Sequence, residues 1–300
     1  LQGFGRRPMT IPAPELEAII LYQLAALAGM ARTEGLTMSH VKPHGALSNM
    51  ACVDPALART VVDAIKDFDP ALILLAPALS KLAEAGYLGG LPVVEEIFAD
   101  RAYTDDGNLV PRSQPGAMIH GAEASLQHVM RMVEESALIS INGKRIPVNP
   151  QSICVHGDNA DAVATARAIR DGLLKAGYEL FMGKAQCSVC HPPPLYTDFA
   201  YHRLGLISSR DEGRGAVEPE QRGAFKTPSL RDAALRPRFF HDASATSLAE
   251  AVAWHLAGGS GQGAARSIID PALEAVVLRD DERAQLMAFL QALTSRPEDL

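Results

Sequence analysis

Residues 54–77 read DPALARTVVDAIKDFDPALILLAP, and this stretch decides the fold class of the first half of the chain. Its first part, 54–68, spaces apolar side chains three and four apart, with Asp54 placed to cap a helix and Pro55 at the first helical position. The continuous apolar run 71–77 is typical of a strand buried on both faces of a parallel sheet. A helix followed directly by a buried strand predicts an α/β unit.

The same alternation continues on both sides of this unit. Further helices are predicted at 12–35, 80–88 and 159–177, and further strands at 36–43, 92–100 and 152–158. Strands that alternate with helices predict a parallel sheet or barrel, with its chemistry at the carboxyl ends of the strands. We therefore expect an α/β domain over 1–175, in the form of a partial β/α barrel.

Beyond residue 176 the strand pattern disappears. Segment 178–191, YELFMGKAQCSVCH, is predicted to be a helix that runs into a cysteine motif. Loops rich in Pro, Gly and Asp follow, with helices predicted at 247–257 and 280–294. The second domain, 176–300, is therefore predicted to be all-α, and the junction is placed near Lys175.

Composition excludes several classes of protein. The 300 residues are 47% hydrophobic and carry a formal net charge of −7, which describes a globular chain without a basic stripe for nucleic acid. No run of 18 apolar residues occurs, so no membrane span is predicted. The chain begins with Leu1 rather than Met, and we expect further residues to precede it.

Four cysteines are too few for a disulfide framework, and Cys52 and Cys154 lie in apolar stretches typical of reduced core thiols. Cys187 and Cys190 precede His191 in CSVCH, and C-x-x-C-H is the attachment signal of a c-type haem. The two thiols add to the two vinyl groups of one haem, and the adjacent imidazole reaches the iron. A zinc knuckle would need two more soft ligands, and a thioredoxin-like site would need a βαβ context.

A second iron ligand is predicted from helix spacing. Ser247 and Glu250 form a predicted capping box, and Gly258 and Gly259 end the helix. His255 falls on the apolar face of this helix, so we predict that it binds the iron opposite His191.

Other residues compete for these roles. The rival iron ligands are Met182, His202, His241 and Met287. Lys226 and Arg231 flank Thr227-Pro228 and are placed to pair with haem propionates, although solvated surface charge explains them equally well.

Three long motifs in the first half carry a resemblance to a known family. They are HVKPHGALSN (40–49), FADRAYTDDGNLVPRSQPGAMI (98–119) and CVHGDNADAV (154–163). In this order they resemble the LamB/YcsF family, the A subunit of 5-oxoprolinase. The resemblance covers roughly 1–175 and implies a β/α barrel that takes part, with partner B and C subunits, in the ATP-dependent opening of 5-oxoproline to glutamate.

The resemblance also implies a set of site residues. They are Lys42, His44, Arg101, Tyr103, Arg112, His156 and Asp158. Two arginines can hold a carboxylate in bidentate fashion, and the histidines and Asp158 offer metal ligands or acid–base groups. Ser48 stands where the family usually has Tyr. The family opens with motifs similar to DLNADLGE and CGFHAGD, and this chain begins after both, so we expect an open sheet edge, an incomplete site and no turnover of 5-oxoproline.

The second half resembles another family. Its motifs are CSVCH, TDFAYHRLGL (197–206), DEGRGAV (211–217), GAFKTPSLRDAAL (223–235), RFFHDASATSLAEAVAWHLAGG (238–259) and DDERAQLMAFLQAL (280–293). This order resembles the C-terminal haem domain of bacterial dihaem cytochrome c peroxidases and MauG-like proteins. The resemblance implies haem c and a redox partner protein, and His255 falls where that family carries its distal Met or Tyr. With a single CxxCH, we expect electron transfer without peroxidase turnover.

Together the two resemblances predict a chimera, and three hypotheses follow. The first is a mono-haem electron-transfer module, which would be periplasmic because haem c is attached outside the cytoplasm. The alternative is a hydrolase similar to the A subunit of 5-oxoprolinase, which would be cytoplasmic because it uses ATP. The third is a fusion with neither activity.

Overall fold

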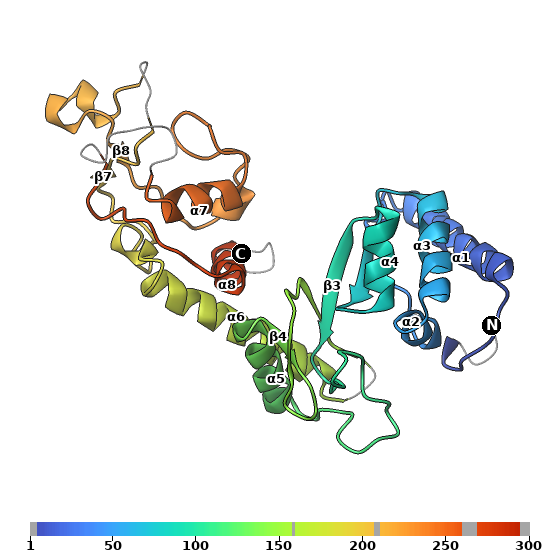
Figure 1. Cartoon of the computed structure of the whole chain (residues 1–300). Helices are drawn as coiled ribbons and strands as arrows, with labels where there is room; N and C mark the ends of the chain where they lie inside the picture. The colour runs from blue at the N-terminus through green and yellow to red at the C-terminus, as the bar shows by residue number, and fades with distance from the viewer. Residues whose placement is uncertain (1–4, 158–159, 207–210, 260–268, 295–300) are drawn as a thin grey trace. The chain divides into compact units, whose positions relative to one another are not determined.

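The computed structural model describes residues 5–157, 160–206, 211–259 and 269–294. The chain divides into two compact units, Leu1–Ile169 and Arg170–Leu300, and each contains its own apolar core (Figure 1). Helix α6 (Ala162–Met182) contains the boundary between the two units. The boundary between the predicted domains, 1–175 and 176–300, falls within the same helix. None of the helices in the described part of the chain has the length and apolar character needed to cross a bilayer.

A four-stranded parallel sheet organises the first unit. In spatial order its strands are β1 (His40–Val41), β2 (Ile73–Pro77), β3 (Val93–Phe98) and β6 (Ser152–Cys154). The register sets Leu74 of β2 opposite Val93 and Phe98 of β3 opposite Cys154. All carboxyl ends therefore lie at one edge, and the predicted partial β/α barrel is confirmed.

Helices pack on this sheet and supply much of the apolar core of the first unit. They are α1 (Ala13–Thr33), α2 (Ala46–Ala51), α3 (Pro55–Phe68) and α4 (Lys81–Gly89). Helix α3 packs between α1 and α4, and α4 contacts β2 and β3 (Figure 1). The Asp54 carboxylate accepts hydrogen bonds from the N–H groups of Ala56 and Leu57 at 2.9 and 3.1 Å, so the predicted cap of α3 is confirmed. A Cβ at Gly86 would lie 2.7 Å from Val93 Cγ2, which explains a glycine where α4 meets the sheet.

Three elements between β3 and β6 were not predicted. They are α5 (Ala122–Glu134) and the antiparallel hairpin of β4 (Ala137–Ile139) and β5 (Arg145–Pro147). The hairpin loop contains Asn142-Gly143, with Gly143 at a φ of 81°. Asn-Gly is a strong local signal for a hairpin, so the sequence contained the evidence for this element.

The second unit is helical. The later part of α6 packs with α8 (Asp280–Ala292) around Phe181, Leu286 and Phe289. A Cβ at Gly177 would lie 2.1 Å from the carbonyl oxygen of Gln285, so α6 approaches α8 more closely than any other residue type allows. The predicted helical character is confirmed, with the addition of a short antiparallel ladder between β7 (Tyr201–His202) and β8 (Phe225–Lys226).

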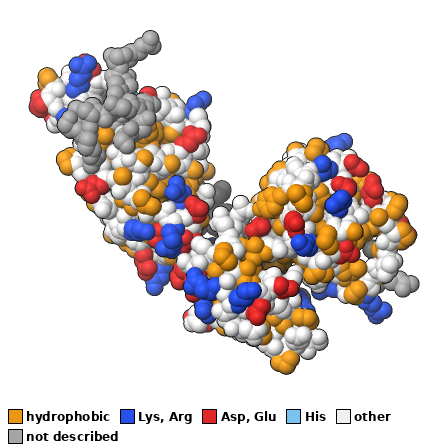
Figure 2. All heavy atoms as spheres, in the orientation of Figure 1, with side chains coloured by type: hydrophobic (Ala, Val, Ile, Leu, Met, Phe, Trp, Pro, Cys, Tyr) orange, Lys and Arg blue, Asp and Glu red, His pale blue; other side chains and the backbone are white. Residues whose placement is uncertain are grey.

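Short turns and one longer helix complete this unit. In the described part of this unit, 3-10 turns lie at Cys187–Val189 (η2), Arg214–Ala216 (η3), Pro219–Gln221 (η4) and Ala233–Leu235 (η5), and helix α7 spans Leu248–Leu256. Ser247 accepts the N–H of Glu250 at 3.2 Å, whereas the Glu250 carboxylate binds the N–H of Thr246 at 2.6 Å. In the predicted capping box the Glu250 carboxylate would accept the N–H of Ser247. It accepts the N–H of Thr246 instead, one residue earlier. On the face shown in Figure 2, acidic and basic side chains are interspersed.

Candidate functional site

The carboxyl edge of the sheet joins a lysine, a carboxylate and a thiol. Lys42 directly follows β1, and its Nζ donates to Glu96 Oε2 at 2.6 Å and to Cys154 Sγ at 3.3 Å. Glu96 lies on β3 and Cys154 ends β6, so the lysine side chain extends past β2 to reach both. The Glu96 side chain is 2% exposed, which makes this a largely buried ion pair.

Burial and charge set the protonation states of this cluster. Burial lowers the pKa of Lys42, but the hydrogen bond and charge of Glu96 outweigh it and raise that pKa above its ordinary value. Burial, followed by the negative charge of Glu96, raises the pKa of Cys154 to about 11. Lys42 is therefore an ammonium and Cys154 a neutral thiol near pH 7. Glu96 Oε1 is buried and has no hydrogen-bond partner among the described residues.

An imidazole and a second carboxylate lie beside this cluster. His156 Nδ1 is 2.8 and 2.9 Å from the two carboxylate oxygens of Asp100, and its ring stacks on Phe98 at 5.7 Å. The same Phe98 ring lies 5.8 Å from Lys42 Nζ. Burial raises the pKa of Asp100, but the His156 hydrogen bond and charge and the Arg101 charge lower it more, and it falls below its ordinary value. Asp100 thus orients the ring, and none of the described residues forms a hydrogen bond with Nε2, the nitrogen that could transfer a proton.

The other barrel residues implied by the resemblance have different surroundings. Arg101 is buried, and its Nη2 donates to the carbonyl oxygen of Val110 at 2.7 Å. The Tyr103 hydroxyl is buried and accepts the N–H of Phe98 at 2.7 Å. Arg112 is exposed, and its charge, after burial, lowers the pKa of Arg101. The two guanidinium groups are therefore near one another, and their role as a carboxylate clamp stays a prediction.

The two remaining implied residues add no contact to the description of this cluster. The His44 side chain is exposed, and Asp158 lies outside the described residues. Glu96 and Asp100, in contrast, were not predicted as site residues, although both lie in the predicted strand 92–100. Cys154 was predicted as a core thiol, and the structure adds its contact with Lys42. An acidic pair at the carboxyl end of a buried strand was the signal that could have identified Glu96 and Asp100.

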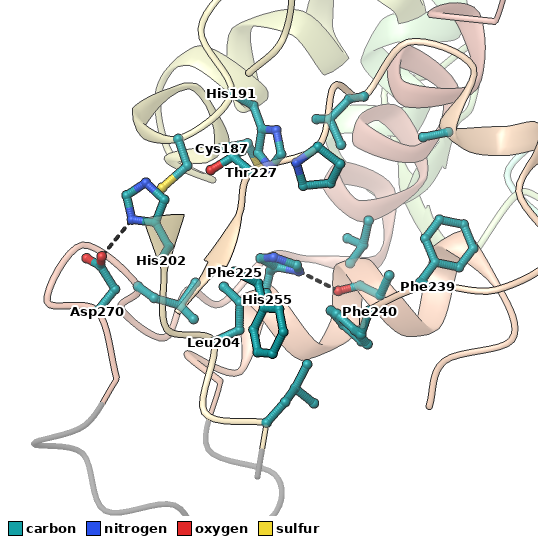
Figure 3. A pocket seen from close by; sticks show the side chains of 18 of the residues that line it. Cys187, His191, His202, Leu204, Phe225, Thr227, Phe239, Phe240, His255 and Asp270 are labelled. Carbon is teal, nitrogen blue, oxygen red and sulfur yellow. Dashed lines mark hydrogen bonds and ion pairs between the residues drawn. The ribbon is translucent and has the colours of Figure 1, made fainter. Parts of the chain in front are cut away.

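The second unit contains a cavity of about 460 Å³ with mostly apolar walls (Figure 3). Turn η2 and the residues after it bring Cys187, Cys190 and His191 to its wall, and α7 brings His255. The cavity has the size of a cofactor site. His191 of the motif and His255 of the predicted ligand helix, 64 positions apart in the sequence, therefore face the same cavity.

Both imidazoles are held by backbone carbonyls. His191 Nδ1 donates to the carbonyl oxygen of Tyr196 at 2.9 Å, and His255 Nδ1 donates to that of Ala251 at 2.7 Å. Within the described residues no hydrogen bond reaches Nε2 of either ring, and both rings point into the cavity (Figure 3). Burial lowers the pKa of His191 to about 4 and also lowers the pKa of His255. Each ring is therefore neutral and presents a nitrogen lone pair to the cavity.

These residues fit a haem c. Cys187 and Cys190 are free thiols, and burial raises the pKa of each to about 11. The apolar walls, including Leu204, Phe225 and Val252, suit a flat macrocycle. Two thiols, an adjacent imidazole and a second imidazole on the facing helix are the donors that covalent attachment and six-coordinate iron require.

The rival iron ligands differ in availability. His202 has both ring nitrogens bound, to Asp198 at 2.8 Å and to Asp270 at 2.6 Å. His241 lines the cavity, stacks on Phe225 at 3.7 Å, and has a buried Nε2 without a partner among the described residues. Met182 is exposed and Met287 lies on α8, and neither is among the cavity-lining residues. His241 is therefore the main rival of His255.

The predicted propionate partners also differ. Lys226 lines the cavity with its Nζ 5.2 Å from the centre of the Phe199 ring. Arg231 is exposed, donates to the carbonyl oxygen of Pro194 at 2.8 and 3.2 Å, and is not a lining residue. Arg236 and Arg238 line the cavity and were not predicted for this role. Lys226 is thus the better placed of the two predicted cations.

One fluorescent side chain lies next to His255. Trp254 is the single tryptophan of the chain, and its Nε1 donates to the carbonyl oxygen of Leu204 at 3.0 Å. Its ring meets the Phe240 ring edge-on at 6.0 Å, and the Phe240 ring also stacks on His255 at 5.8 Å. The tryptophan is therefore in contact with two lining residues of the cavity, Leu204 and Phe240, without lining it itself.

Known proteins are similar to large parts of this chain. The A subunit of 5-oxoprolinase from Azoarcus sp. is 54% identical over 180 residues, which are 60% of this chain and 70% of that protein. The A subunit of 5-oxoprolinase from Rhodopseudomonas palustris is 47% identical over 178 residues, 59% of this chain and 70% of that protein. The crystal structure of a lactam utilization protein from Thermus thermophilus is 40% identical, with a TM-score of 0.54 over 58% of this chain and 70% of that one.

A more distant likeness involves another solved structure. The crystal structure of a MauG-like protein associated with microbial copper homeostasis is 23% identical, with a TM-score of 0.36 over 48% of this chain and 58% of that one. At this distance the likeness supports no inference about function. The LamB/YcsF family model, in contrast, matches residues 1–187, well over half of the chain. By this match, and by the parallel sheet and motifs that it covers, the chain belongs to the LamB/YcsF family.

Proposed function

We propose that the second unit is a mono-haem c-type electron-transfer module. Cys187 and Cys190 attach the haem, His191 is the proximal ligand and His255 is the distal ligand. The observation that carries this proposal is the pair of neutral imidazoles whose free Nε2 atoms point into one apolar cavity beside two thiols. A haem bound there supplies a one-electron carrier.

The residues of the chain set the properties of this site. The carbonyl groups of Tyr196 and Ala251 fix the ring orientation and tautomer of both imidazoles before any ligand arrives. The apolar walls exclude water, and two histidine ligands give a lower reduction potential than a histidine and a methionine. Lys226 at the wall is placed to pair with a propionate carboxylate.

Expression of the full chain with and without c-type haem maturation tests this function. We expect the matured protein to gain the mass of one haem that denaturation does not remove, together with a haem absorption spectrum. The Cys187→Ala/Cys190→Ala double variant should keep the mass of the bare polypeptide. A bare mass for the matured wild-type chain would contradict the proposal.

The first unit supports a second function, that of the A subunit of 5-oxoprolinase, which works with ATP and the B and C subunits. The observations that favour it are membership of the LamB/YcsF family and the buried polar cluster at the carboxyl edge of the sheet. His156, oriented by Asp100, is placed to move a proton through Nε2. Glu96 Oε1 is an unpaired acceptor suited to the N–H of a lactam ring.

Glutamate formation from 5-oxoproline, measured with ATP and the partner B and C subunits, distinguishes the two functions. Release above a no-enzyme control, abolished by His156→Ala, would make hydrolysis the function of the first unit. The matched variant Lys81→Ala, at an exposed ion pair with Glu84 on α4, should leave this rate unchanged. Release equal to the no-enzyme control would leave electron transfer as the function of the chain.

A further inference from the structure

Three different metal-ligand side chains meet beside the haem cavity. The Cys190 thiol, the Asp198 carboxylate and the His202 ring each offer one donor atom, and all three atoms lie within 4.8 Å of one another. All three side chains are partly buried. Among the described residues this is the one such cluster of three or more, and it is not explained by haem attachment.

The cluster is held in place from outside. His202 Nδ1 binds Asp270 Oδ2 at 2.6 Å (Figure 3). This contact directs Nε2 toward Asp198 Oδ2, at 2.8 Å. A carboxylate on the far nitrogen of a histidine is the usual support of a metal-binding imidazole. The N–H of Asp198 donates to the carbonyl oxygen of Cys190 at 3.0 Å, which fixes these two residues against each other. The donor atoms are therefore positioned before a cation binds. A cation that binds both Asp198 Oδ2 and His202 Nε2 replaces the proton that these two atoms share, which a haem iron bound to His202 alone would not do.

The donor types select the cation. A thiolate, an imidazole nitrogen and a carboxylate oxygen are the ligands of Zn²⁺, and three protein ligands leave a fourth position for water. Co²⁺ accepts the same donors and geometry and reports a bound thiolate in its absorption spectrum. Hard cations such as Mg²⁺ and Ca²⁺ prefer all-oxygen sites and suit this set poorly.

We propose that the haem-free chain binds one Zn²⁺ ion through Cys190 Sγ, Asp198 Oδ2 and His202 Nε2, with Asp270 as a positioning residue. This site goes beyond the proposed electron-transfer function, but the two share one atom. Haem attachment converts Cys190 Sγ to an uncharged thioether, which removes the thiolate ligand. The metal and the haem are therefore alternative occupants of Cys190.

Cobalt titration of the full chain, expressed without haem maturation and kept reduced, tests the site. We expect saturable binding of one Co²⁺ with a near-ultraviolet thiolate-to-cobalt band, which Zn²⁺ abolishes by displacement. Cys190→Ser should remove the band, whereas Cys187→Ser, the same change three residues earlier, should retain it. Asp270→Asn should keep the band but weaken binding by about 10–100-fold.

Three outcomes would overturn the proposal. They are the absence of the band in the wild-type chain, its persistence in Cys190→Ser, and its equal loss in Cys187→Ser, which would indicate binding by the cysteine pair instead. Far-ultraviolet circular dichroism of each variant checks the fold, and the wild-type titration remains decisive if a variant does not fold. Failure of haem attachment would not change the cobalt result, so the two proposals fail separately.

Discussion

The two candidate sites satisfy their polar groups in opposite ways. In the first unit Lys42, Glu96, Asp100 and His156 bind mainly one another. In the second unit the hydrogen bonds that His191 and His255 form with described residues go to backbone carbonyls through one nitrogen, and the other nitrogen faces an apolar cavity. A site of the first kind contributes to stability without a ligand, whereas a site of the second kind gains most of its stability when the ligand binds.

The variant with the largest expected effect removes the distal imidazole. In the haem-loaded protein, His255→Ala should convert a low-spin ferric absorption spectrum completely to a high-spin one, because the sixth ligand is lost. His241→Ala is the matched control, since this ring lines the same cavity, and it should leave the spectrum low-spin. The opposite result for the two variants would assign the ligand to His241.

In the first unit the matching change is Lys42→Met, which leaves the Glu96 charge buried and unpaired. We expect it to lower the free energy of unfolding by about 2–4 kcal/mol, measured by urea denaturation. Lys81→Met breaks an exposed pair with Glu84 of the same 2.6 Å length and should cost no more than about 0.5 kcal/mol. Equal effects of the two variants would show that burial does not set the cost.

A smaller effect depends on pH. The pKa of Asp100 is lower in the folded chain than its ordinary value of 3.8. Its interactions therefore stabilise the fold above pH 3.8, and this contribution is lost as the pH falls through the folded-state pKa. His156→Leu should cost about 1–2 kcal/mol at pH 7, and the cost should shrink toward zero in strong acid. A cost independent of pH, measured by urea denaturation across this range, would rule out the carboxylate as the partner.

The smallest expected effect concerns the wall of the haem cavity. Lys226→Met removes a partly solvated cation beside the proposed haem, so the oxidised state is favoured and the reduction potential should fall by about 20–40 mV. Arg231→Met should shift the potential less, because that guanidinium binds the Pro194 carbonyl and does not line the cavity. Spectroelectrochemical titration of both variants measures the difference, and a larger shift for Arg231→Met would reverse the assignment.

Local patterns were sufficient for part of each site. The CSVCH motif is contiguous, and the 3.6-residue period of α7 fixes the direction of His255 once the helix start at Ser247 is known. The helix–strand alternation likewise predicted the parallel sheet. In these cases the relevant residues lie within one element or one turn.

The remaining contacts join distant positions. Lys42 and Cys154 are 112 residues apart, and His202 and Asp270 are 68 residues apart. The first contact depends on β6 lying next to β3, and strand order is not encoded in the periodicity of any single strand. The second depends on the segment 269–279, which forms neither a helix nor a strand. Sequence patterns therefore predicted the elements that carry the site residues but not the partners of those residues.

The position of Trp254 gives the second unit a built-in optical reporter. Because it is the single tryptophan and contacts the lining residues Leu204 and Phe240, excitation selective for tryptophan reports on the surroundings of the cavity. A haem held in this cavity will quench its emission by energy transfer, and unfolding will restore part of the emission as the indole moves away from the haem. Fluorescence of the unmodified chain therefore follows haem loading and the unfolding of this unit without any added label.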